Sequence, residues 1–187
     1  TLLLGMHGEI ISLLDAQESE ATYYGSVVSS VKGASSSSTS SSSTTSAQVT
    51  TQVACTDGVA RTFYHSGSAL NTGRLVTVSV TQSGTKVTSL SNKKLEGSVS
   101  KDGSSFAGHD FADGVQILDT DENGGYARIY PSRLAGAKLS GDDVRYYSLA
   151  ANGDIDRLVL HEVTGDTWEY VYVSSVVNNS SDMNISA

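Results

Sequence analysis

The sequence predicts an all-β protein built from two small antiparallel β-barrels, or barrel-like sandwiches, in tandem. Three observations lead to this prediction. Apolar and polar residues alternate with a period of two along most of the chain, which is typical of half-buried strands. Glycine-containing turns separate the alternating segments and favour hairpins. Short strand motifs return after about seventy residues, which indicates copied supersecondary units.

The repeat rests on matched glycines. Gly25 lies in a Tyr-Gly-Ser-Val motif and Gly97 lies in a Glu-Gly-Ser-Val motif. Gly84 and Gly153 each follow an alternating segment, at the turn of an expected hairpin. If the two units share one fold, Gly25 should superpose on Gly97, and Gly84 on Gly153.

The motifs divide the chain into four parts. Residues 1–20 are expected to be the closing hairpin of a preceding unit. Residues 21–92 form the first unit, with a Ser/Thr-rich loop inserted at 33–47. Residues 93–165 form the second unit. Residues 166–187 are expected to be the opening strand of a following unit and a flexible tail.

Four hairpins are predicted within this frame. Each joins two alternating segments across a turn that contains glycine, because glycine adopts the positive φ that tight turns need. The turns are expected at 7–8, 82–84, 122–125 and 152–153.

A run of serine and threonine fills residues 35–46. It has no apolar surface to bury, so it is expected to be a flexible loop. It could be an O-glycosylated or spacer loop, or an insertion tolerated at a loop tip. The sequence favours the insertion, because long surface loops cost little conformational entropy.

Composition excludes several function classes. The chain has 187 residues and a net charge of −8 at pH 7. Clustered Lys and Arg, which phosphate recognition requires, are missing, so neither nucleic acid nor an anionic membrane is an expected partner. No apolar run approaches the length of a spanning helix, so membrane insertion is not expected. The chain lacks an initiator Met, and we interpret it as a piece of a longer polypeptide.

The only cysteine, Cys55, excludes an intrachain disulfide. With His65, His7 and Arg61 it raises the hypothesis of a sortase-like cysteine transpeptidase. The residues before Cys55 do not match the Thr-Leu-x-Thr-Cys strand of that family. A buried, structural Cys55 is therefore favoured, with no catalytic residue and no cofactor in the chain.

One acidic turn has the beginning of a calcium loop. Asp119, Asp121 and Asn123 place oxygen atoms at alternate positions, and Gly124 follows where such a loop needs its glycine. The twelfth position is Tyr130, which cannot supply the bidentate carboxylate. A weak calcium site and an ordinary acidic hairpin turn are both open, and the turn is favoured.

Tyrosines on the predicted strands allow a further hypothesis. A face lined with them could bind carbohydrate by stacking, although packing between strands is the commoner role. The tyrosines concerned are Tyr23, Tyr24, Tyr146, Tyr147, Tyr170 and Tyr172.

Three segments of the chain resemble a known family. They are residues 151–170, which begin Ala151-Asn152-Gly153-Asp154-Ile155, residues 126–147, and the Ser-rich insertion after Tyr23-Tyr24-Gly25. The chain resembles the repeat region of S-layer-homology-domain proteins on Gram-positive anaerobic bacteria. The resemblance implies a structural, non-catalytic spacer module of an extracellular, wall-attached protein. Its partners would be further copies of itself or other units of the same polypeptide. An adhesin that binds cell-wall or host glycans is the alternative.

Overall fold

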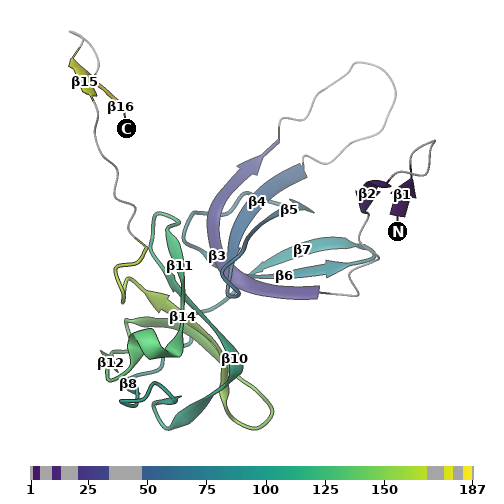
Figure 1. Cartoon of the computed structure of the whole chain (residues 1–187). Coiled ribbons are helices and arrows are strands. Elements are labelled where there is room, and N and C mark those ends of the chain that lie inside the picture. The colour runs from purple at the N-terminus through teal and green to yellow at the C-terminus, as the bar shows by residue number, and fades with distance from the viewer. Residues whose placement is uncertain are drawn as a thin grey trace, which may run out of the picture.

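The computed structural model describes the side chains of residues 21–33 and 48–167. It also describes the backbone of four strands near the two ends of the chain. In these parts the regular structure consists of β-strands and one short 3₁₀ helix, η1 (Pro131–Leu134). The predicted all-β class is therefore confirmed (Figure 1).

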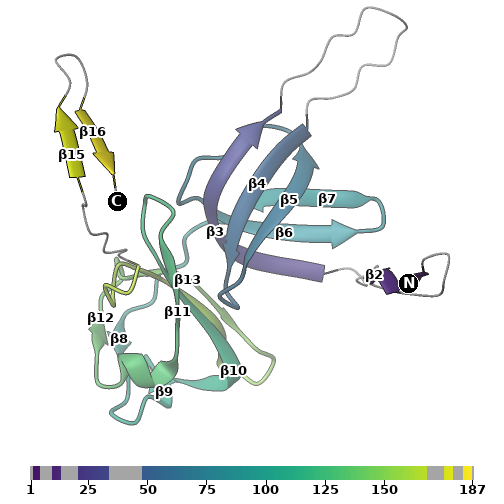
Figure 2. The same ribbon diagram turned by 45° about the horizontal axis from the view of Figure 1, so that its top comes forward.

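The first sheet is antiparallel throughout, in the order β5-β4-β3-β6-β7. It curls into a half-barrel, so that its two edge strands, β5 and β7, come into contact with each other (Figure 2). A hydrophobic cluster of Val27, Val53, Cys55, Phe63, Val76 and Val78 fills its interior. The strands are β3 (Ala21–Lys32), β4 (Gln48–Cys55), β5 (Ala60–Ser66), β6 (Leu75–Thr81) and β7 (Gly84–Ser89).

The second sheet has the order β11-β10-β14-β13 and a hydrophobic cluster of its own. Phe106, Ile117, Ile155, Leu158 and Leu160 are fully buried in that cluster. Helix η1 adds Leu134 to it. The long strands are β10 (His109–Thr120), β11 (Tyr126–Ile129), β13 (Val144–Leu149) and β14 (Ile155–His161). The short ones are β8 (Gly97–Ser98), which pairs with β12 (Lys138–Leu139), and β9 (Ser105–Phe106), which pairs with β10.

The second sheet corrects the expectation of an antiparallel fold. Strands β10 and β14 run parallel, with Ile117 opposite Leu158 and Thr120 opposite His161. A parallel pair needs a long connection that carries the chain back to the starting edge. Here β11, η1, β12 and β13 lie between the two strands in sequence, and this crossover cannot be recognised from period-two alternation.

The expected match of Gly25 with Gly97 does not hold. Gly25 lies in β3, which pairs with strands on both of its sides. Gly97 lies in the two-residue strand β8, whose partner is β12. Gly84 and Gly153 each lie at a hairpin between two consecutive antiparallel strands, but the edge strand is the second of the pair at Gly84 and the first at Gly153. Two equivalent tandem units are therefore not confirmed.

The strands at the two ends agree in part with expectation. Strand β1 (Leu2–Leu4) pairs with β2 (Ile10–Leu13), so the hairpin predicted near the amino terminus is present. Strand β15 (Ser175–Asn178) pairs with β16 (Met183–Ser186), within the expected opening strand and tail of residues 166–187. Residues 168–174, expected to be a strand, and most of the Ser/Thr-rich loop lie outside the described residues.

Aromatic and polar side chains join the two halves. The ring of Tyr24, in β3, stacks on that of Tyr146, in β13, with centroids 6.0 Å apart. The Arg157 guanidinium lies over the same Tyr24 ring, 4.8 Å from its centroid. The Thr56 hydroxyl, which is buried, donates a hydrogen bond to Gln116 Oε1 at 2.6 Å.

Two arginines of the second half complete this interface by binding backbone carbonyls of the first. Arg128 donates from Nη1 to the Thr56 carbonyl at 2.6 Å and from Nη2 to the Val115 carbonyl at 2.7 Å. Arg145 donates from Nη2 to the Gly73 carbonyl at 2.5 Å. Hydrogen bonds thus connect the two halves at separate points.

The interface also explains why the second sheet is buried on both faces. Leu118 and Val159 are buried, yet Leu118 directly follows Ile117 of the core cluster, and Val159 lies between its members Leu158 and Leu160. Because side chains alternate along a strand, they point away from that core. Gln116 and Arg157 lie two residues from them on the same face and contact the first half. The first half therefore covers this face.

We predict that Gly25→Ala destabilises the protein. A Cβ atom at this position would fall on the carbonyl oxygen of Ala54, in the neighbouring strand. That backbone cannot move without breaking the β3–β4 pairing, so a loss of about 1–3 kcal/mol is expected, as for other overpacked sites. Urea unfolding measures it, with Ser66→Ala, an exposed position at the end of β5, as control. Equal stability of the two variants would contradict the packing described at Gly25.

Candidate functional site

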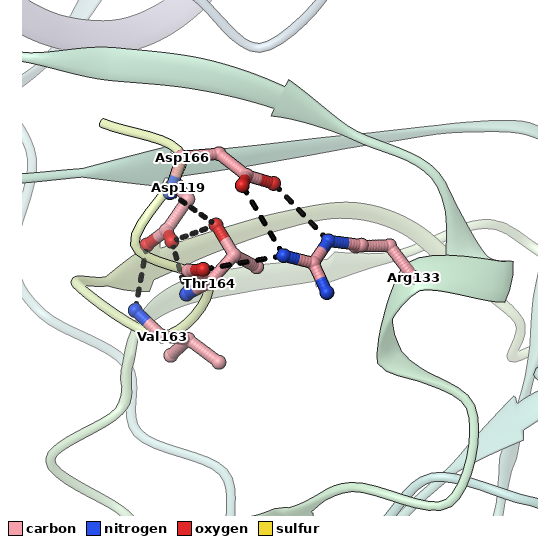
Figure 3. Close-up of polar contacts among 5 residues, drawn as sticks. All are labelled: Asp119, Arg133, Val163, Thr164 and Asp166. Carbon is pink, nitrogen blue, oxygen red and sulfur yellow. Dashed lines mark hydrogen bonds and ion pairs between the residues drawn. The ribbon is translucent and has the colours of Figure 1, made fainter. Parts of the chain in front are cut away.

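The buried carboxylate of Asp119 anchors the turn that follows β14 (Figure 3). Its Oδ1 accepts hydrogen bonds from the backbone N–H of Val163 and of Thr120, both at 3.1 Å. Its Oδ2 accepts from the backbone N–H and the hydroxyl of Thr164, both at 2.7 Å. Both oxygens are thus occupied by internal donors, and the chain leaving β14 is tied to the end of β10.

The other two predicted calcium ligands belong to a different turn. Asp121 Oδ1 accepts from the backbone N–H of Asn123 at 2.8 Å and of Gly125 at 2.7 Å. Asn123 is exposed. Asp119 and Asp121 therefore hold separate turns. Among the described residues, no group of three or more His, Cys, Asp or Glu side chains is placed to hold a metal ion.

An exposed ion pair lies beside the anchored turn. Arg133, in η1, donates from Nε and Nη2 to the two carboxylate oxygens of Asp166, each at 3.2 Å (Figure 3). Its Nη2 also lies 3.4 Å from the Thr164 carbonyl oxygen. The hydrogen bond from Arg133 holds the pKa of the Asp166 carboxyl below its usual range. The pair therefore connects η1 to the chain beyond β14.

An exposed aromatic residue lines two pockets next to this ion pair. Tyr130 follows β11 directly and is 66% exposed. One pocket is lined by Tyr130, Arg128, Arg133 and Asp166, among others. The other is lined by Tyr130, Arg128 and Asp113, with Ser104 and Phe111. Tyr130 and Arg128 thus belong to both pockets, and we call the pair of pockets the Tyr130 groove.

Arg128 holds the Tyr130 ring from one side. Its guanidinium carbon lies 5.7 Å from the ring centroid, within the range of a cation–π contact. The backbone of Tyr130 is extended, and its carbonyl accepts the hydrogen bond of Arg133 N in the first turn of η1. The ring is therefore positioned by its own backbone and by a neighbouring cation. Arg128 Nε is buried with no hydrogen-bond partner among the described residues.

Sequence reasoning did not identify these residues as a site. It singled out other tyrosines, of which Tyr24 and Tyr146 are used in the interface between the halves. One local signal was available: Tyr130 is an aromatic residue directly before proline, where the backbone is extended and the helical region is disfavoured. Nothing in the sequence shows that Asp113 and Asp166 lie near it.

Cys55 is buried, as predicted, at 2% exposure. Its thiol lies 3.7 Å from the Val53 carbonyl oxygen, and burial raises its pKa. His65 uses both ring nitrogens elsewhere. Its Nδ1 lies 3.0 Å from the Ser66 carbonyl and so donates, while Nε2 accepts from the Thr51 hydroxyl at 2.8 Å. The structure therefore brings no general base to Cys55 from His65, and His7 lies outside the described residues.

Comparison with known proteins leaves the chain without a match. No family model, no curated protein and no solved structure is similar to it at a significant level. In the described part of the chain, no helix has the length and apolar character needed to cross a membrane.

We predict that Asp119→Asn destabilises the protein by about 1–3 kcal/mol, because the amide nitrogen would face backbone and hydroxyl donors that are left unsatisfied. Thermal and urea unfolding measure the loss. Asp110→Asn is the matched control, since Asp110 lies in the same strand and is exposed. A variant at Asp119 as stable as that control would show that the carboxylate does not anchor the turn.

Millimolar calcium is expected to leave the unfolding midpoint unchanged, because both oxygens of Asp119 already accept hydrogen bonds. Thermal unfolding with and without calcium is the measurement, with magnesium as the ionic-strength control. A midpoint that rises with calcium in the native protein, and no longer rises in Asp121→Ala, would establish the site instead.

The carboxyl of Asp166 is expected to titrate below the usual Asp range, and Arg133→Gln should return its pKa toward that range. The folded-state pKa is depressed, so the pair stabilises the fold above the unfolded-state pKa. This contribution is lost as the pH falls through the folded-state value. Carboxyl-carbon NMR across an acid titration gives the pKa of Asp166 in the native protein and in Arg133→Gln. Identical titration in the two proteins would argue that the ion pair is absent in solution.

Proposed function

We propose that this chain is a structural spacer module of an extracellular, wall-attached surface protein of the S-layer type, without catalytic activity. A spacer has to keep its shape without a bound ligand. The observation that carries the proposal is the interface between the two sheets. There Arg128 and Arg145 of one half donate hydrogen bonds to backbone carbonyls of the other.

The distribution of polar groups supports this function. Carboxylates that looked like ligands from the sequence bind the chain's own backbone, as Asp119 and Asp121 do. The nucleophile suggested by the sequence, Cys55, lies in the core of the first sheet. The histidine nearest to it in sequence, His65, stabilises a buried network with Thr51 and Ser30. These groups stabilise the fold.

The tandem arrangement is part of this proposal. Each half has its own sheet and its own hydrophobic cluster, which suits a polypeptide assembled from successive β units. The resemblance of residues 151–170 to S-layer-associated repeats supplies the location and the kind of partner, namely further units of the same polypeptide. The low share of charged residues, 17%, and the abundant Ser, Thr and Gly suit an exposed sheet protein.

Location tests this function. Antibodies raised against the chain should label intact source cells, and brief protease treatment of those cells should remove the signal. Antibodies against a cytoplasmic protein of the same cells control for lysis. Labelling that appears only after the cells are broken open would exclude a surface spacer.

The stacked pair across the interface should couple the stabilities of the two halves. In a double-mutant cycle with Tyr24→Ala and Tyr146→Ala, we expect a coupling free energy of about 0.5–1.5 kcal/mol, the range for aromatic pairs. Urea unfolding of the four proteins measures it. A second cycle with Tyr24→Ala and Tyr64→Ala is the control, because Tyr64 is exposed in β5. If the losses of unfolding free energy in Tyr24→Ala and Tyr146→Ala are purely additive, this pair does not couple the two halves.

A further inference from the structure

We propose that the Tyr130 groove binds a neutral oligosaccharide with flat pyranose rings, such as a β-linked glucose or N-acetylglucosamine chain. The occupant would stack one sugar ring on Tyr130 and extend into the pocket on either side. This binding site is additional to the spacer function and does not depend on it.

The aromatic ring is the first reason. A pyranose ring with equatorial substituents has apolar C–H faces, which pack against the face of an aromatic side chain, while its hydroxyls remain at the rim. Tyrosine suits this role because it combines an apolar ring with a polar hydroxyl that tolerates water. Tyr130 is 66% exposed and directly precedes η1, so a ligand can reach it.

The shape of the groove is the second reason. The two pockets have volumes of about 380 and 360 Å³, near the lower end of the usual range for ligand pockets, roughly 300–1,000 Å³. Each is small, but they share Tyr130 and Arg128. Two adjoining small pockets with an aromatic ring between them suit successive units of a chain molecule better than one compact ligand.

The balance of charge is the third reason, and it selects a neutral ligand. The groove is lined by two cations, Arg128 and Arg133, and by two carboxylates, Asp113 and Asp166. Arg133 and Asp166 already form an ion pair. A phosphate or sulfate would meet as much negative as positive charge. Sugar hydroxyls, in contrast, donate to carboxylates and accept from guanidinium groups.

The ring is also prepared for stacking before a ligand arrives. Arg128 is held at the interface by hydrogen bonds to the Thr56 and Val115 carbonyls, and it lies over the Tyr130 ring. The backbone at Tyr130 is set by η1. A side chain that is already ordered loses less conformational entropy on binding, so more of the stacking free energy contributes to affinity.

Binding of chitohexaose and cellohexaose to the whole chain tests the proposal, by calorimetry or by ligand-observed NMR. We expect at least one of them to bind, and Tyr130→Ala to weaken that binding by about tenfold or more, in line with the loss of one stacked ring. Tyr130→Phe keeps the ring and should retain most of the affinity.

The matched control is Tyr64→Ala, because Tyr64 is 57% exposed and lies on the first sheet. It should bind like the native chain. Circular dichroism and the unfolding midpoint of each variant separate lost binding from lost folding. The proposal is overturned if neither oligosaccharide binds at millimolar concentration, or if Tyr130→Ala binds as tightly as Tyr64→Ala. Neither result would bear on where the protein is located, so the spacer function is tested separately.

Discussion

Hydrogen bonds from arginine to backbone carbonyls hold the two halves of this protein in place, and the other features depend on them. Arg128 binds a carbonyl in each half, which a guanidinium can do because its donors point in several directions. Arg145 joins the halves as well, because it donates to the Gly73 carbonyl of the first half and to the Thr120 hydroxyl of the second. Burial lowers the pKa of Arg145, since a desolvated cation is costly. The carbonyl dipoles offset part of that cost.

Acidic side chains serve the fold in a complementary way, by accepting hydrogen bonds from turns. Asp119 ties the chain after β14 to the end of β10. Hydrogen bonds from Ser100 and Ser104 lower the pKa of Asp102 to about 2 in the turn before β9. The net charge of −8 is therefore partly spread over turns in which each carboxylate has internal donors. Hydrogen bonds within the chain stabilise these turns.

Arg128 belongs both to the interface between the halves and to the Tyr130 groove. It fastens the halves through Thr56, and it also lies over the ring of Tyr130 in the groove. A rigid interface thus positions the side chain against which a sugar would stack. Under the two proposals made above, one module would both hold its neighbours at a distance and attach to a polysaccharide.

The sequence alone determined the β class, the hairpins at Gly84 and Gly153, and the burial of Cys55, because alternation and turn glycines act over a few residues. The tertiary structure decided the parallel pairing of β10 with β14, which depends on a crossover of more than thirty residues. It also decided that Asp119 is an anchor, because the donors at 163 and 164 are distant in sequence. The Tyr130 groove arises for the same reason: Asp113 and Asp166 come to line pockets with Tyr130 only after the strands have packed.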